Sequence, residues 1–220
     1  MHRRGAGGLG HGLALLAGFL TLPSSQSIKG RMDLNDDPRW RRFNDANRPC
    51  PCCGQTFNGV FDIGFDHPAP WPHGNRAETG ADFMEAGDDQ LDADLCKWGK
   101  YRFIRAVLML PIRGTDQVFA YGPWGSVNPG NFDRYVEASK SGEPFEGCFA
   151  WLMNRLPGFD FEDWPPCDLI VEDANERPRL YVHDGAHELA DLQENGITFD
   201  QLLDIYAAAG QDIRPHLLDG

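Results

Sequence analysis

Residues 101–112 read YRFIRAVLMLPI, and this run decides the fold class. Aromatic and aliphatic residues fill it, and its first half alternates between two faces, which is typical of a β-strand. Residues 113–116 (RGTD) supply a turn, and residues 117–127 (QVFAYGPWGSV) return as a second strand. The two runs predict an antiparallel hairpin. Pro123 and Gly125 in the returning strand predict a bulge or an edge position there.

Further strands are predicted on both sides of this hairpin. They are the alternating apolar runs at residues 57–65, 167–173 and 179–183. The acidic, glycine-containing stretch 74–94 predicts a loop or a frayed helix.

Helices are predicted in three places. The spacing of Trp40 and Phe43 fits a short helix that docks on the core, and residues 131–140 fit another. Near the C-terminus, Thr198 and Gln201 form a capping box ahead of an apolar run. Strands joined by hairpins, with helices set apart, predict an α+β fold with a mainly antiparallel sheet.

Length and charge bound the function. The 220 residues suit one domain, and the formal net charge is −13. Such a chain lacks the basic patch that nucleic-acid binding requires, so we expect no nucleic-acid partner. The expected partner is an unknown protein or a small molecule.

The N-terminal residues differ in composition from the rest. Arg3, Arg4 and an apolar stretch at 12–22 outline a secretory signal over residues 1–27, and this stretch is too short to span a membrane. A second interpretation is an upstream extension of a cytoplasmic protein that starts at Met32, and a third is a membrane-associated tail. We therefore expect residues 1–31 to lie outside a single domain formed by 32–220. The expected location is the cytoplasm, or the periplasm or exterior if 1–27 act as a signal.

The most specific chemical motif is the run CPCCG at residues 50–54. Cys50 and Cys53 form a C-x-x-C pair on a turn that a glycine closes, which predicts a zinc-ribbon-like knuckle. The same spacing also suits a redox dithiol. A turn that binds no metal is the third alternative.

A closed structural zinc site needs two more ligands. The predicted set is Cys50, Cys53, Cys96 and His67, with zinc as the cofactor, and Cys52 and His73 as alternative ligands. A DNA-binding finger is excluded because the prolines between the two histidines forbid a helix there. An even number of cysteines would permit disulfides, but a chain of this size does not need them, and reduced thiols fit better.

Three other groups of residues are candidates for function. His183, His187 and Glu188 have a spacing that metal ligands use on a helix, although Gly185 weakens a helix there. Arg102 and Arg105 fall on opposite faces of the principal strand, so one of them points inward and needs a partner. Several tryptophans with neighbouring prolines could line a ligand groove, namely Trp71, Trp98, Trp124, Trp151 and Trp164.

Taken together, the motifs resemble a known bacterial family. They are CPCCG, GVFDIG at 59–64, DHPAPWP at 66–72, YRFIRAVLMLPI and YGPWGSVNPGNF at 121–132. This combination is similar to the uncharacterised bacterial proteins grouped as domain of unknown function 2199, over roughly residues 48–210. The features that recur in that family align with Cys50, Cys53, Gly54, Cys96, Arg105, Trp124 and Asn131. The resemblance implies a family and assigns no catalytic residue.

The predicted function is a binding or interaction module with a structural zinc site at the CPCCG turn. The alternative is an enzyme, either a metal-dependent hydrolase that uses His183 and His187 or a thiol-disulfide oxidoreductase that uses Cys50 and Cys53. A structural metal is closed by four protein ligands, whereas a catalytic metal keeps an open position.

Overall fold

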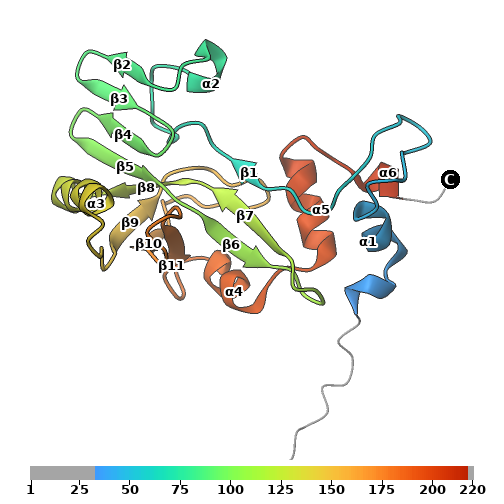
Figure 1. Cartoon of the computed structure of the whole chain (residues 1–220). Helices are drawn as coiled ribbons and strands as arrows, with labels where there is room; N and C mark the ends of the chain where they lie inside the picture. The colour runs from blue at the N-terminus through green and yellow to red at the C-terminus, as the bar shows by residue number, and fades with distance from the viewer. Residues whose placement is uncertain (1–32, 218–220) are drawn as a thin grey trace, which may run out of the picture. The chain divides into compact units, whose positions relative to one another are not determined.

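The hairpin predicted over residues 101–127 is present, but its two halves belong to different sheets (Figure 1). The computed structural model describes residues 33–217. The strands are β1 (Ile63–Gly64), β2 (Met84–Ala86), β3 (Asp89–Leu91), β4 (Leu95–Trp98), β5 (Tyr101–Arg105), β6 (Leu108–Pro111), β7 (Val118–Gly122), β8 (Trp124–Val127), β9 (Cys148–Leu152), β10 (Pro166–Ile170) and β11 (Arg179–Val182). The helices are η1 (Leu34–Asp36), α1 (Pro38–Phe43), α2 (Arg76–Thr79), α3 (Pro129–Ser141), α4 (Glu188–Asn195), α5 (Phe199–Ala208) and α6 (Arg214–Leu217).

The hairpin divides at Pro123 on one arm and at Ala106 and Val107 on the other. Pro123 has no N–H to donate, so it interrupts a strand ladder. Its carbonyl still accepts a hydrogen bond from the Ala106 N–H at 2.8 Å, which keeps the two arms together across the division. Beyond this point β6 and β7 turn away, and Val107 pairs instead with Arg179 in β11.

The larger sheet has the order β11-β10-β9-β8-β5-β4-β3-β2, and every neighbouring pair in it is antiparallel. The smaller sheet has the order β1-β7-β6, with β1 parallel to β7. The α+β fold with a mainly antiparallel sheet is therefore confirmed. Among residues 33–217, no helix has the length and apolar character needed to cross a bilayer.

The eight-stranded sheet carries a core on each face. Ile104 and Leu169 belong to the main core, which the sheet shares with β6, β7 and the helices α1, α3, α4 and α5. Phe103, the neighbour of Ile104, points to the opposite face and joins a second core. The second core consists of Trp71, Leu91, Cys96, Phe103 and Trp124.

The three predicted helices are present, and the predicted capping box is formed. In α1, Trp40 and Phe43 are buried, and Trp40 packs edge-on against Phe199 of α5 at 5.0 Å between ring centroids. Thr198 and Gln201 form the predicted capping box at the start of α5. These caps supply partners for the backbone N–H groups that a helix leaves free in its first turn.

Two predictions need correction. Of the run 57–65, only Ile63–Gly64 pairs as a strand. The preceding backbone bonds to helices instead, because the Phe61 N–H donates to the Tyr206 hydroxyl in α5 and the Gly59 N–H donates to the Phe43 carbonyl in α1. The stretch 74–94 contains β2 and β3, which form a hairpin at one end of the larger sheet. Its acidic composition concealed the strands, because half-exposed strands at a sheet end tolerate charged side chains. The expectations for residues 1–31 concern a segment outside the described residues.

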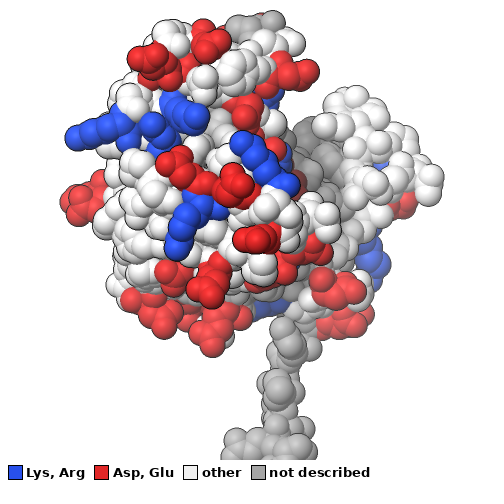
Figure 2. All heavy atoms as spheres, turned by 60° about the vertical axis from the view of Figure 1, so that its left-hand side comes forward, with Lys and Arg blue, Asp and Glu red and all other residues white. Residues whose placement is uncertain are grey.

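The charge of the chain is visible on its surface. Figure 2 shows Asp and Glu side chains from the top to the bottom of one face, with Lys and Arg side chains near its middle. On the part of this face that the described residues form, the basic side chains do not join into a continuous strip. The acidic side chains on this face agree with the net charge of −13.

Gly125 lies at the centre of the larger sheet, so the expected edge position is wrong. It pairs with Ile104 in β5 and with Leu152 in β9. A Cβ atom on Gly125 would lie 3.3 Å from Leu180 Cδ2 and 3.4 Å from Ala150 Cβ. Side chains of the main core therefore fill the space that a side chain at Gly125 would occupy.

We expect Gly125→Val to lower the free energy of unfolding by about 1–3 kcal/mol, because the added atoms overpack this core. Gly130→Val is the matched control, since Gly130 is exposed in α3 and its nearest neighbour to a Cβ atom is Asn128 Oδ1 at 3.5 Å. The control should change stability by less than about 0.5 kcal/mol. Urea unfolding measures both, and equal losses would contradict the packing argument.

Candidate metal centre

The CPCCG turn is held by its own backbone. The Cys50 N–H donates to the Gln55 carbonyl and the Gly54 N–H donates to the Cys50 carbonyl, both at 2.7 Å. Gly54 has a φ of 74°, a conformation that glycine adopts without strain. This turn carries three cysteines in four residues and directs their sulfur atoms to one side.

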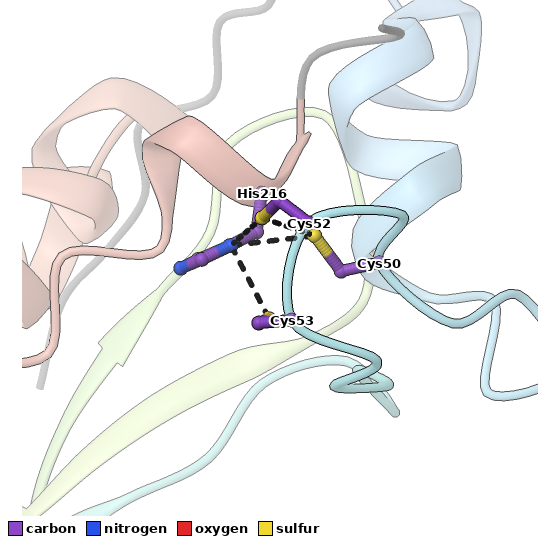
Figure 3. Close-up of side chains that lie close together, drawn as sticks. All are labelled: Cys50, Cys52, Cys53 and His216. Atoms are coloured by element: carbon purple, nitrogen blue, oxygen red, sulfur yellow. Dashed lines mark hydrogen bonds between the residues drawn. The ribbon is translucent and has the colours of Figure 1, made fainter.

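The segment that faces the turn comes from the other end of the chain. Helix α6 is anchored by Ile213 and Leu217, which are both buried. Arg214 forms an ion pair with Asp204 of α5 at 2.7 Å. These contacts place α6 beside α1 (Figure 1). The ring of His216 points toward the turn (Figure 3).

Three sulfur atoms and one imidazole nitrogen converge at this point (Figure 3). The Nδ1 atom of His216 lies 3.4 Å from Cys50 Sγ, 3.3 Å from Cys52 Sγ and 3.7 Å from Cys53 Sγ. The Sγ atoms of Cys50 and Cys52 are 3.0 Å apart. All four ligand atoms lie within 4.8 Å of one another. All three cysteines are free thiols.

These distances fit a small tetrahedral ion. Zinc bonds of about 2.3 Å to sulfur and about 2.0–2.1 Å to nitrogen place tetrahedral sulfur and nitrogen ligands about 3.6 Å apart. The three distances to His216 lie close to that separation. The distance between Cys50 and Cys52 is shorter than the roughly 3.8 Å between two zinc-bound sulfurs. A bound ion would therefore require these two side chains to move apart slightly.

The thiols influence one another's protonation. The hydrogen bond with Cys52 lowers the pKa of Cys50 to about 6, and His216 contributes to the same shift. The same hydrogen bond raises the pKa of Cys52 to about 11. Near neutral pH the pair therefore holds one thiolate and one shared proton. A thiolate is the form that binds metals.

The comparison with known families matches residues 49–197 to the family described as "Uncharacterized protein conserved in bacteria (DUF2199)". The chain belongs to this family. The resemblance inferred from the sequence motifs is thus confirmed. No curated protein and no solved structure matches the chain.

The three cysteines lie inside the segment that matches DUF2199, whereas His216 lies beyond its end. The spacing of the cysteines drew attention to the turn, and Cys52 was an alternative ligand. No signal in the sequence indicates His216, because more than 160 residues separate it from Cys53 and no other cysteine or histidine lies near it in the sequence. Only the packing of α6 brings it to the turn.

The structure places the other two predicted ligands elsewhere. Cys96 belongs to the second core, where burial raises the pKa of its thiol to about 12. His67 donates from Nδ1 to the Pro68 carbonyl at 2.9 Å. The alternative ligand His73 contacts Asp89 at 2.8 Å. Neither Cys96 nor His67 is in the group at the CPCCG turn.

The histidines of the second candidate group do not converge. His183 lies 3.2 Å from Asp168 in β10. His187 caps α4, where its Nδ1 accepts a hydrogen bond from the Leu189 N–H at 3.1 Å. Within residues 33–217, the cluster at the CPCCG turn is the one group of three or more ligating side chains at metal-binding distance.

The arginines of the principal strand point to different surroundings. Arg102 donates to the carbonyls of Gly99 and Tyr101, each at 2.8 Å. Arg105 is half-buried and donates to the Ala93 carbonyl at 3.3 Å. Burial lowers the pKa of Arg105, and nearby Arg177 acts in the same direction.

The five tryptophans that are candidates for a ligand groove divide into two sets. Trp71 and Trp124 are buried in the second core. Trp98, Trp151 and Trp164 line a groove of about 710 Å³.

The thiol cluster predicts a titration that can be measured. In reduced, metal-free protein, the ultraviolet absorbance of thiolate should rise by one equivalent with a midpoint near pH 6, as Cys50 ionises. Cys52→Ala should move this midpoint up toward the ordinary value of 9.0, because it removes the largest cause of the shift. Cys148→Ala is the control, since burial raises the pKa of Cys148 to about 11. A midpoint near pH 6 that survives Cys50→Ala would contradict the assignment.

Proposed function

We propose that this protein is a binding module in which Cys50, Cys52, Cys53 and His216 hold a structural zinc ion. The observation that carries the proposal is the convergence of four ligand atoms within 4.8 Å, from two segments at opposite ends of the described chain. Three thiolates and one imidazole are a common ligand set of structural zinc. Soft sulfur ligands favour zinc over magnesium or calcium, which prefer oxygen.

A structural role is favoured over a catalytic one because the protein supplies all four tetrahedral positions. A catalytic zinc keeps one position for water or substrate. The ion would link the turn after α1 to α6, which has only four residues. A helix this short is not stable without tertiary contacts. Zinc would thus stabilise the meeting point of the cysteine turn and α6, and a protein or small-molecule partner would bind elsewhere on the surface.

The cytoplasm is the location that this proposal favours. Zinc-binding cysteines must be reduced and ionised, and cytosolic thiols are kept reduced. The ligand set proposed here replaces Cys96 and His67 by Cys52 and His216, because the latter pair meets Cys50 and Cys53 at the turn.

A thiol-disulfide oxidoreductase is the second candidate. The lowered pKa of Cys50 and the 3.0 Å between Cys50 and Cys52 sulfurs favour it, because a thiolate close to a second thiol is the reactive arrangement in such enzymes. Cys52 and Cys53 are exposed, so a substrate could reach them. Metal analysis separates this candidate from the first.

The full chain, purified under reducing conditions, should contain one equivalent of zinc. Cys53→Ser and His216→Asn should each lose stoichiometric zinc and lower the melting temperature by about 5–10 °C, because the stabilisation by the bound ion is lost. His67→Gln is the matched control, since its side chain lies outside the cluster, and it should retain the zinc. Elemental analysis and a thermal scan measure these effects.

Two outcomes would contradict the zinc site. Retention of one equivalent of zinc in both ligand variants would place the metal elsewhere. Absence of metal, together with a disulfide that forms and is reduced reversibly, would support the oxidoreductase instead. Mass spectrometry after thiol alkylation identifies that disulfide.

Removal of the ion should loosen the two linked segments and little else. After chelation, amide hydrogen exchange should accelerate at residues 50–55 and 213–217, whereas β8 at the centre of the larger sheet should keep its protection. The reason is that the two segments lie at the periphery, where local opening requires less free energy than global unfolding. Uniform acceleration across the sheet would show that the ion supports the whole fold.

A further inference from the structure

One face of the larger sheet carries a groove of about 710 Å³ that the proposed zinc site does not involve. We name it the aromatic groove, and the side chains that matter in it are Trp98, Tyr101, Trp151, Trp164 and Asp163. They come from β4, β5, β9 and the segment before β10. Strand register brings Trp98, Tyr101 and Trp151 to the same face. Trp98 pairs with Tyr101, and Phe103, two residues further along β5, pairs with Ser126 of β8. Ser126 pairs in turn with Trp151 of β9.

Two of these rings are exposed to solvent. Tyr101 has 46% of its surface exposed and Trp151 has 44%. The neighbours of Trp151 in β9, Ala150 and Leu152, are fully buried, so strand alternation directs the tryptophan outward. Large aromatic residues that gather on an exposed surface mark binding sites more often than scattered single ones do.

The rings are held in place before any ligand arrives. Trp98 stacks on Tyr101 at 5.3 Å between centroids, with an angle of 28° between the planes. Trp151 meets Phe149 edge-on at 5.0 Å. Rigid aromatic side chains lose little conformational entropy when they bind, so this arrangement favours binding.

The ring faces and the one carboxylate of the aromatic groove suit a cation. Asp163 is the one charged side chain among its lining residues, and the lining contains no Lys or Arg. The faces of Trp and Tyr rings attract cations through their quadrupoles. Cations of the protein lie over two of these rings, with Arg155 at 4.5 Å from the centroid of Trp164 and Lys100 at 5.4 Å from that of Tyr101. A cationic ligand would therefore use the faces of Trp98 and Trp151.

We propose that the aromatic groove binds a small organic cation that carries a quaternary ammonium group. Such a cation has no N–H to satisfy, and its methyl groups suit apolar ring faces. A primary ammonium would need several acceptors, and the groove offers one carboxylate. An anion would meet Asp163 and a chain of net charge −13. The inference rests on the binding role proposed above, although not on the zinc ion.

The test uses choline and its neutral isostere 3,3-dimethylbutan-1-ol as probes of the full chain. We expect saturable shifts of the tryptophan indole N–H signals in NMR titrations. Choline should bind about ten-fold more tightly than the isostere, because only the cation gains the ring and carboxylate attraction. Equal affinities would overturn the inference, and so would the absence of saturable choline binding.

Variants assign the binding to this groove. Trp151→Ala should weaken choline binding about ten-fold, and Asp163→Asn should weaken it while leaving the isostere unaffected. Phe83→Ala is the matched control, because Phe83 is an aromatic residue with 49% exposure outside the groove. Circular dichroism shows that each variant is folded. Unchanged affinity in folded Trp151→Ala would overturn the proposed site.

Metal analysis of the same samples separates this inference from the proposed zinc site. Zinc-loaded, folded protein that does not bind choline overturns the ligand inference alone. Metal-free, folded protein that binds choline at Trp151 supports the ligand inference and overturns the structural zinc.

Discussion

The division of the long hairpin at Pro123 is the constraint on which the rest of the structure depends. Because Pro123 cannot donate a hydrogen bond, β7 and β8 cannot continue as one strand in one ladder. The hydrogen bond from Ala106 keeps the arms together while they enter separate sheets. As a result β6 lies against α4 and β7 against α5. Helix α5 in turn helps to position α6 beside the cysteine turn through the ion pair of Asp204 with Arg214.

The hairpin and the C-terminal helix could be predicted because their signals are local. Alternation identifies strands, and the Thr198 and Gln201 pair identifies a helix start. The assignment of the strands to two sheets could not be predicted, because one proline is compatible with a bulge, an edge or a change of sheet. Strands β2 and β3 could not be predicted from alternation, because their position at the end of the sheet permits an acidic composition.

Two of the four residues of the candidate metal centre could likewise be predicted from a local signal. The C-x-x-C spacing is local, so it drew attention to Cys50 and Cys53. The partners depend on tertiary packing. Cys96 was predicted as a ligand because it precedes the principal strand. Strand alternation instead directs its side chain into the second core, beside Phe103. His216 reaches the turn only because Ile213 and Leu217 are buried on either side of it.

The proposed zinc ion would change the electrostatics of the cysteine turn. Thiolates on both Cys50 and Cys52 would repel each other, since their sulfur atoms are 3.0 Å apart. Without a cation, the proton shared by Cys50 and Cys52 reduces this repulsion, lowering one pKa and raising the other. A zinc ion would replace that proton with two positive charges and stabilise every thiolate at once. Its binding would therefore release protons, and the link between the two ends of the fold would weaken as the pH falls.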